Sequence, residues 1–397
     1  PFTAAIQIRF KKPADTARTR LETRTLDPKL DRLAFRRRRL AVCRSLHEKL
    51  YYSSRKRGRF ISLNLLPRWA PLVGLKTIAG GKFVQKYPHV FEVFTHPLKR
   101  NLCCRFTKKF TDLVDLEDEA HSEMEEANVM KIGKILAMSL HGRVHVHAIR
   151  LIRTELGLPR SFVETLIRNR ERVFSMANPE IVELVNWEEE EEEVNQRFTA
   201  QVEKWREKEY REKWLSEYDT KYAFPVNFPT GFRMGPGFRE KLKNWQRLPY
   251  IKPYQRTLTP SSSSSSSGGE IESWNLKIAG IERYQKRAVG IIHELLHLTV
   301  EKMIDLDRLS HFRKDLGIEI NIREVLLKHQ GIFYISTRGN RPVVFLREAY
   351  DKGILTHSDE IEIIRRKMLE LLLLGRRFTR RLKGDSDGGT SYKNGTD

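Results

Sequence analysis

Residues 331–350 read GIFYISTRGNRPVVFLREAY, and this stretch indicates the fold most clearly. Two runs rich in β-branched and aromatic residues flank Arg338-Gly339-Asn340, which is a turn signal, so the stretch predicts a β-hairpin. The segment just before it, 325–330, has the apolar spacing of a helix. A helix is therefore expected to turn almost directly into the first strand of the hairpin.

The same pattern occurs twice earlier in the chain. Segments 83–93, 166–176 and 325–335 each place two apolar residues seven positions apart, followed by Phe, one spacer and another apolar residue. The shared phenylalanines are Phe91, Phe174 and Phe333. The first copy also continues into a predicted hairpin, with VFEVF and LCCRF on either side of a turn at 96–101.

This repeat predicts the architecture. We expect an α+β fold that is mostly helical and is built from repeated helix–helix–β-hairpin units resembling a winged helix. The copies are unequal and widely separated, which argues against a solenoid. Lys99 and Arg100 stand at one hairpin tip, and Arg338 and Arg341 at another, where they could lie along phosphates. A solvated turn is the alternative for each of them.

Charge indicates the class of partner. The chain has 397 residues, and 73 Lys and Arg oppose 51 Asp and Glu, for a formal net charge of +22. An excess of this size favours a polyanion, either nucleic acid or, less often, an anionic membrane surface. A basic protein that is merely soluble is the alternative. No apolar run approaches the ~20 residues that span a bilayer, so we expect no membrane partner.

The basic residues gather in particular segments. Residues 29–50 have the apolar spacing of a helix, and four consecutive arginines, 36–39, wrap around most of it. At least two of them must face solvent, where they could contact phosphate or simply be hydrated. The predicted phosphate-contacting residues are Arg36, Arg37, Arg38, Arg39, Lys56, Arg57, Arg59, Lys99, Arg100, Arg105, Lys108, Lys109, Arg338 and Arg341.

Aromatic residues supply a second kind of candidate. Trp245, Tyr250 and Tyr254 lie in an irregular stretch rich in proline. They could stack on unpaired bases. The more usual role of such residues is to clamp a loop against the core.

Residues 293–297 read HELLH, the spacing that places two imidazoles around zinc in metallopeptidase helices, with the glutamate as base. No third histidine follows at short range, although Glu319 or Glu324 could supply a distant ligand. The helical pattern puts both histidines at the edge of an apolar arc and Glu294 on its polar side. It therefore favours a structural helix over a zinc site.

The cysteines indicate neither a metal nor a disulfide. Cys43, Cys103 and Cys104 form no Cys-x-x-Cys pair, and adjacent cysteines cannot easily bridge each other. We expect a reducing compartment, no cofactor and no metal. We also see no convincing catalytic constellation.

Several blocks together resemble the plant organelle RNA recognition (PORR) family. They are DPKLDRLAFRRRRL (27–40), GGKFVQKYPHVFEVF (80–94), LGLPRSFVETLIRNRERVF (156–174), NWQRLPYIKPY (244–254), RAVGIIHELLHLTVEK (287–302) and the long block 329–375. The resemblance implies a plant organellar RNA-binding protein, not an enzyme, placed in the mitochondrion or alternatively the chloroplast. It implies promotion of group II intron splicing by binding and folding intron transcripts, without protein catalysis.

Two other functions remain open at this point. One is a structural component of an organellar, mitochondrial ribosome bound to ribosomal RNA. The more remote one is an HExxH zinc metallopeptidase. Other splicing factors are further possible partners.

The resemblance and the composition, with an N-terminal stretch rich in Thr, Arg and Lys and poor in acids, suggest how the chain is divided. We expect a basic segment behind a removed transit peptide, although a trimmed chain would look the same. The six successive glutamates 188–193 and the serine tract 261–267 depart from the family pattern. The expected segments are 1–26, the basic N-terminal segment; 27–186, the first half of the PORR domain; 187–269, an acidic helix, a Pro/aromatic stretch and a Ser-rich linker; 270–375, the second half; and 376–397, a disordered basic tail.

Overall fold

The computed structural model describes residues 17–53, 59–75, 80–185, 198–213, 217–255, 270–339 and 341–386. Within them the chain is a mixture of helices and small antiparallel sheets, which confirms the α+β class. Lys56, Arg57, the glutamate run and the serine tract lie outside the described residues. None of the described helices is long and apolar enough to cross a membrane.

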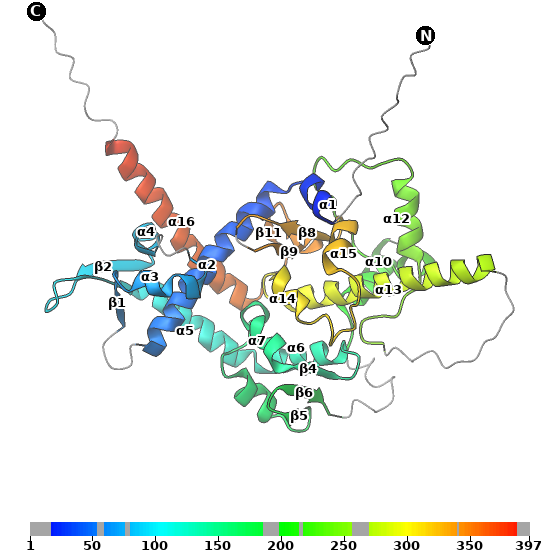
Figure 1. Cartoon of the computed structure of the whole chain (residues 1–397), viewed down its shortest axis with the longest axis horizontal. Coiled ribbons are helices and arrows are strands. Elements are labelled where there is room, and N and C mark those ends of the chain that lie inside the picture. The colour runs from blue at the N-terminus through cyan, green and yellow to red at the C-terminus, as the bar shows by residue number, and fades with distance from the viewer. Residues whose placement is uncertain are drawn as a thin grey trace, which may run out of the picture.

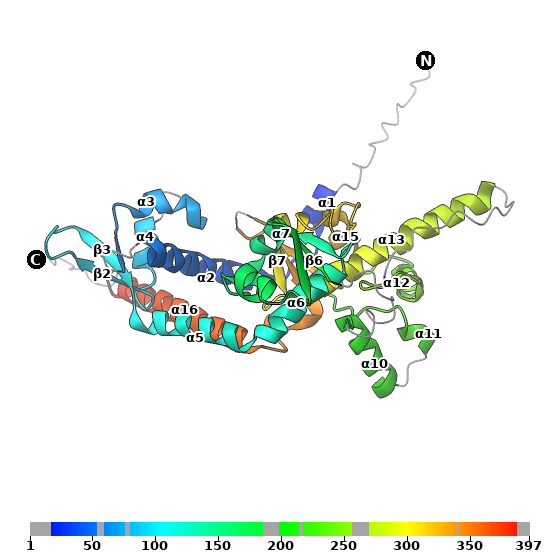
Figure 2. The ribbon, with the colours of Figure 1, turned by 90° about the horizontal axis from the view of Figure 1, so that it is seen from below.

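Three segments of the chain share one order of elements, and we name them units 1, 2 and 3. Unit 1 comprises α2 (Pro28–Ser53), β1 (Phe60–Ser62), α3 (Leu66–Trp69), η1 (Pro71–Val73), α4 (Gly80–Gln85), β2 (Phe91–Thr95) and β3 (Leu102–Phe106). In Figures 1 and 2 its β2–β3 hairpin projects from one end of the elongated molecule.

Unit 2 follows in the same order. It comprises α6 (Glu125–Ala137), β4 (Arg143–His145), α7 (Val146–Leu151), α8 (Arg153–Leu156), η3 (Val163–Arg168), β5 (Phe174–Asn178) and β6 (Ile181–Leu184). Unit 3 begins after the central segment of the chain, which comprises residues 198–255. It comprises α13 (Glu270–Leu298), β7 (Met303–Asp305), α14 (Leu306–Ser310), α15 (Ile322–Lys328), β8 (Phe333–Ser336) and β9 (Val343–Leu346).

The three sheets have the same topology, and their strands pair in corresponding register apart from an irregularity between Ser175 and Asn178 in β5. Their strand orders are β1-β3-β2, β4-β6-β5 and β7-β9-β8, so in each the third strand lies in the middle. The central residues of the first strands pair as Ile61↔Cys104, Val144↔Val182 and Ile304↔Val344, and all six side chains are buried. Each unit therefore builds its core around a corresponding pair.

The phenylalanine repeat falls at one structural position. Phe91, Phe174 and Phe333 are buried and begin the second strand of their sheets. Each backbone N–H donates to the carbonyl four residues earlier, over 2.9, 2.9 and 3.0 Å. The chain thus passes from a hydrogen-bonded turn directly into the strand, as the sequence pattern predicts.

In each unit a glycine in the left-handed conformation ends the helical stretch that follows the first strand. Gly74, Gly157 and Gly317 have φ of 78°, 72° and 64°. Each stands at the same interval from the last residue of that strand, which is Ser62, His145 or Asp305. A Gly in this conformation ends a helix by letting the chain reverse without steric strain.

Units 2 and 3 pack against each other and share one large core cluster. The N–H of Leu140 donates to the carbonyl of Asp315 over 3.0 Å, and the N–H of Val300 donates to that of Glu155 over 2.7 Å. Leu140 and Val300 occupy corresponding places in their units, as do Glu155 and Asp315. The two units therefore meet in a reciprocal, pseudo-two-fold arrangement.

Unit 1 has its own core, completed by two helices outside the repeat. These are α5 (Lys108–Glu123) and α16 (Glu360–Ser386), which lie beside α2 in Figure 2. Helix α16 runs through Ser386, past residue 376, where the sequence led us to expect the start of a disordered tail. The apolar pattern ends at Leu374, but the residues that follow include good helix formers that prolong the helix.

The other elements lie around the three units. They are α1 (Ala17–Thr23), α10 (Gln201–Lys213), α11 (Glu217–Thr220), α12 (Phe238–Arg247), η4 (Arg347–Ala349), β10 (Tyr350–Asp351) and β11 (Ile354–Leu355). The central segment 198–255, which carries α10, α11 and α12, packs on α13.

Candidate nucleic-acid interface

The HELLH segment is engaged in packing. His293 is 0% exposed, meets the ring of Phe224 edge-on at 5.6 Å, and has Nε2 2.8 Å from Oε1 of Glu348. Burial and the neighbouring Lys302 lower the pKa of His297 to about 2, so this imidazole is neutral at physiological pH. No three His, Cys, Asp or Glu side chains within the described ranges are arranged to hold a metal ion.

The position of Glu294 differs from the one that the sequence predicts. It was placed on the polar side of the helix, but it is buried. Its carboxylate accepts from the N–H of Gln201 and the hydroxyl of Tyr254, both over 2.7 Å, and from Lys134 Nζ over 3.3 Å. The central segment covers this face of α13, which a helical wheel alone does not reveal.

Trp245, Tyr250 and Tyr254 act as clamps. Tyr250 and Tyr254 are buried, and Trp245 is partly buried against Phe224 and His329. The fully buried Lys286 donates to the carbonyls of Trp245, Gln246 and Leu248 at 2.6–2.9 Å and so caps the end of α12. These aromatics hold the central segment on α13, and the two buried tyrosines offer no open face to a base.

Two of the predicted cation pairs flank the β2–β3 hairpin. Lys99 and Arg100 are exposed at its tip, and Lys108 and Lys109 are exposed at the start of α5, just after β3. At about 3.3 Å per residue, β3 separates the two pairs by roughly 15–20 Å. Two lysines in the first turn of a helix oppose its dipole, which an anionic ligand would relieve.

The remaining cation of the hairpin is already paired. Arg105 lies on β3 and is exposed, with Nε and Nη2 2.8 and 2.9 Å from the carboxylate oxygens of Glu92 on β2. The Arg105 guanidinium also lies 5.3 Å from the centroid of the Phe94 ring. An exposed pair of this kind is weak, so a phosphate could compete for Arg105.

The arginines of α2 have different surroundings. Arg37 is 7% exposed, and its guanidinium lies 2.8 Å from Glu301 and 2.7 Å from Glu362. Arg36 and Arg39 are partly exposed, and Arg39 lies over the rings of Phe35 and Phe83. Arg37 therefore anchors α2 inside the molecule and is not a candidate phosphate contact.

Arg38 joins α2 to the hairpin of unit 3. Its guanidinium donates to the carbonyls of Arg338, over 3.2 Å, and Arg341. Partial burial lowers the pKa of Arg38, with Asp305 acting in the opposite direction. Arg338 and Arg341 are exposed beside it, so this hairpin tip, which is the second predicted basic tip, is fixed on α2.

A cleft of about 480 Å³ opens where the three units meet. Its walls come from α2, α5, the segment around α8 and the strands β7 and β9. Its floor is an internal charge network. Buried Glu117 accepts from Arg44 and Arg365, both over 2.8 Å, and Arg308 pairs with Glu155. The charges of the floor are thus largely neutralised within the protein.

Burial alone would raise the pKa of Glu117, but Arg365 and Arg44 outweigh it and hold that pKa at about 2. For the neighbouring His121, burial is the larger effect. It lowers the pKa of the imidazole to about 4 despite the attraction of Glu117. The floor therefore contains an ionised carboxylate and a neutral imidazole at physiological pH.

The mouth of the cleft differs from its floor. Tyr51 and Tyr52 end α2 and are 47% and 53% exposed. Arg59 lies over the Tyr51 ring, with its guanidinium 5.2 Å from the centroid, and Arg160 lies over the Tyr52 ring at 4.6 Å. Sequence reasoning missed both tyrosines and Arg160. The signal was available only in part, as two tyrosines directly before the basic run SSRKRGR.

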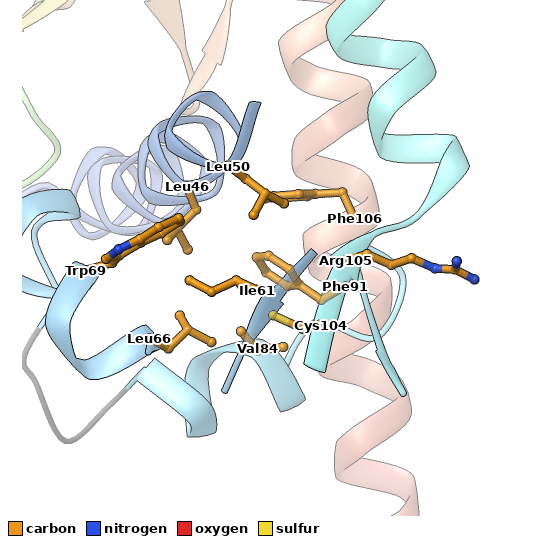
Figure 3. Close-up of a pocket in the computed structure, with 10 residues that line it drawn as sticks. All are labelled: Leu46, Leu50, Ile61, Leu66, Trp69, Val84, Phe91, Cys104, Arg105 and Phe106. Carbon is orange, nitrogen blue, oxygen red and sulfur yellow. The ribbon is translucent and has the colours of Figure 1, made fainter. Parts of the chain in front are cut away.

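A second cavity, inside unit 1, is not a ligand site. It has a volume of about 10 Å³, and most of its lining is apolar. Figure 3 shows Leu46, Ile61 and Phe91 around it, while the charged end of Arg105 points away. An apolar space of this size stays dry and belongs to the core.

The comparisons with known proteins agree with these features. Residues 25–377 match the family described as "Plant organelle RNA recognition domain". The chain is 38% identical to the Arabidopsis thaliana protein ROOT PRIMORDIUM DEFECTIVE 1, over 85% of this chain and 79% of that relative. No solved structure gives a significant match.

Two further relatives are more distant. The chain is 28% identical to the Arabidopsis thaliana protein WHAT'S THIS FACTOR 1 homolog, chloroplastic, over 81% of this chain. It spans only 58% of that relative's length. It is 24% identical to WHAT'S THIS FACTOR 9, mitochondrial, from the same plant, over 73% of this chain and 69% of the relative.

Proposed function

Because the chain belongs to the plant organelle RNA recognition family, we propose that it is an organellar RNA-binding protein that promotes splicing of group II introns. Group II introns supply their own catalytic RNA, so the protein need only favour the active RNA fold. The observation that carries this proposal is the set of exposed cations at both ends of the β2–β3 hairpin, in a chain that matches the family over 25–377. Such cations neutralise phosphates where RNA helices approach each other.

The fold supports the same function. We propose that units 1, 2 and 3 are winged-helix-like, since each has a strand, helical turns and a hairpin with the first strand against the last. The hairpins of units 1 and 3 carry basic tips, whereas the turn of unit 2 contains Pro179 and Glu180. Units 1 and 3 would then contact RNA while unit 2 supports them.

The HELLH residues do not support a peptidase. Glu294 accepts three hydrogen bonds from neighbouring elements, and His293 is enclosed by Phe224 and Glu348. A general base and zinc ligands need access to water and substrate. The proposed role is therefore binding without protein catalysis.

The proposed contact residues are the predicted set without Arg37. They are Arg36, Arg38, Arg39, Lys56, Arg57, Arg59, Lys99, Arg100, Arg105, Lys108, Lys109, Arg338 and Arg341, of which Lys56 and Arg57 lie outside the described residues. We propose the mitochondrion as its location, with the chloroplast as the alternative; one relative is named as mitochondrial and another as chloroplastic.

Sequencing of the RNA that co-purifies with the tagged protein from isolated organelles tests this function. Enrichment of group II intron transcripts, with loss of spliced product in plants lacking the protein, is the expected result. Ribosomal RNA as the main bound species, retained on ribosomal particles at high salt, would instead indicate a structural component of the ribosome. Recovery of no RNA above background would contradict RNA binding altogether.

A further inference from the structure

The mouth of the cleft exposes two aromatic rings beside two cations. Tyr51 and Tyr52 are consecutive on the last turn of α2, and their ring centroids lie 5.7 Å apart with an interplanar angle of 86°. Each exposes about half of its surface, unlike the buried Tyr250 and Tyr254. Neither tyrosine belongs to the hydrophobic core clusters of the described residues, so these rings do not fill the core.

The two cations come from different units. Arg59 precedes β1 in unit 1, and Arg160 lies between α8 and η3 in unit 2. Arg160 pairs with Glu48, which also lies 3.2 Å from Arg153. Burial lowers the pKa of Arg160 to about 10, so its guanidinium stays charged at physiological pH. Units 1 and 2 thus hold planar guanidinium groups against planar rings at one place.

The size of the cleft suits a small planar ligand. Its volume of about 480 Å³ lies within the range of about 300–1,000 Å³ typical of ligand sites. Tyr51, Tyr52, Arg59 and Arg160 all line it. Unpaired bases stack on tyrosine and on guanidinium planes, while arginine also binds the adjoining phosphate. A base pair within a helix exposes no such face.

We propose that Tyr51 and Tyr52, together with Arg59 and Arg160, form a binding site for an unpaired nucleotide of RNA. The base stacks on an exposed tyrosine face, and one of the two arginines binds the adjoining phosphate. This proposal rests on the proposed RNA-binding function and names the form of RNA that the cleft takes. The hairpin cations would bind the phosphates of paired regions, and the cleft would add a preference for single strands.

The test compares two forms of one RNA. An unstructured RNA oligonucleotide and the same oligonucleotide annealed to its complement are titrated with the full chain, and the Kd is measured by fluorescence anisotropy. For the variant that combines Tyr51→Ala and Tyr52→Ala we expect affinity for the single strand to fall roughly 10- to 100-fold. Affinity for the duplex should change by less than about twofold, since its bases are already stacked.

Tyr218→Ala is the matched control. Tyr218 on α11 is 68% exposed and has Arg247 5.0 Å above its ring, but it does not line the cleft. This variant should bind both RNAs like the wild type. The variant that combines Tyr51→Phe and Tyr52→Phe keeps the rings and should also retain single-strand affinity.

The outcomes separate this site from the general function. If the wild type binds RNA and the double alanine variant binds the single strand equally well, the cleft is not a base site. The same holds if RNA affinity is unchanged but a co-purifying protein is lost, because the tyrosines would then be a protein contact. If the wild type binds neither RNA, the proposed function itself fails.

Crosslinking of the wild type removes any dependence on how well the variants fold. The unstructured RNA is made with 4-thiouridine, irradiated in complex, and the crosslinked peptides are mapped by mass spectrometry. A crosslink on the peptide containing Tyr51 and Tyr52 is expected. Crosslinks found elsewhere, but not on this peptide, would overturn the proposal.

Discussion

At the scale of single residues, Glu117 joins three helices through buried charge. It is a buried carboxylate held by Arg44 of α2 and Arg365 of α16, so it ties three helices together. Removing one partner of a buried ion pair costs about 3–5 kcal/mol, because the remaining charges stay buried without compensation. Glu117 thus stabilises the floor of the cleft through charge and not through apolar contact.

Glu117→Gln should lower the free energy of unfolding by about 3–5 kcal/mol, because it leaves Arg44 and Arg365 without their shared carboxylate. Denaturant titration at neutral pH measures this loss. Glu119→Gln, at an exposed position on the same helix, is the control and should change stability by less than about 0.5 kcal/mol. Equal stability of the Glu117 variant and the wild type would contradict the role given to the network.

Acid should destabilise the wild type, and two groups in the floor of the cleft contribute to this loss. The folded pKa of His121 is about 4, below its ordinary 6.5, so stability falls as pH drops from about 6.5 to 4, where the unfolded chain takes up the proton first. The folded pKa of Glu117 is about 2, below its ordinary 4.5, so a further loss follows between about 4.5 and 2. Unfolding curves across this pH range test both, and a stability that rises on acidification would refute them.

Individual roles were only partly predictable from the sequence. Arg37 and Arg39 belong to one run of four arginines, yet Arg37 is buried and Arg39 is not. The partners of Arg37 are Glu301 and Glu362, which lie 264 and 325 positions further along the chain. A helical pattern read locally carries no information about such distant carboxylates.

At the scale of elements, the left-handed glycines provide a comparison within one molecule. A Cβ on Gly157 would lie 2.7 Å from Cγ2 of Val300, and one on Gly317 would lie 2.8 Å from Cδ2 of Leu140. A Cβ on Gly74 would meet nothing within 4 Å. The first two glycines therefore allow units 2 and 3 to approach closely, whereas Gly74 provides only a turn.

Gly157→Ala should cost about 2–5 kcal/mol, the sum of backbone strain at positive φ and overpacking against Val300. Gly74→Ala carries only the backbone strain and should cost about 1–2 kcal/mol. Thermal unfolding of the two variants side by side measures the difference. If both lost the same stability, the close approach of units 2 and 3 at this glycine would not be important.

The β2–β3 hairpin gives a prediction about RNA affinity. The variant that combines Lys99→Ala and Arg100→Ala should reduce the slope of log K against log salt by about 1.4–1.8, since each lost phosphate contact removes about 0.7–0.9. The control combines Lys208→Ala and Arg211→Ala, two exposed cations of α10 that pair with Glu212 and Glu207. An unchanged slope in the hairpin variant, or an equal change in the control, would exclude this tip from the interface.

Helices and strands were predictable from the sequence where the periodic pattern of apolar residues was long enough. The hairpin of unit 3 and the three phenylalanines follow from alternation, turn residues and spacing that lie within a few positions of each other. The first strands β1, β4 and β7 have three residues each, too few for any periodicity, and they form only because the third strand offers a central position. The tyrosines at the end of α2 were missed because Arg160, which covers Tyr52, belongs to another unit.

At the scale of the whole molecule, three similar units have unequal surroundings. Units 2 and 3 bury their corresponding faces against each other, while unit 1 packs with α5 and α16 and carries the projecting hairpin in Figure 1. The cleft exists only because all three converge, so neither its volume nor its lining could be inferred from a single segment. A net charge of +22, by contrast, was visible at once and pointed to a polyanion.

The salt dependence of RNA affinity tests the central claim most directly. The Kd of the full chain for a group II intron transcript is measured between low and moderate monovalent salt. If a half-dozen or more phosphates are neutralised by the proposed cations, log K should fall against log salt with a slope steeper than about −4. An affinity that stays constant over this range would contradict the account, because the surplus positive charge would then have no part in holding RNA.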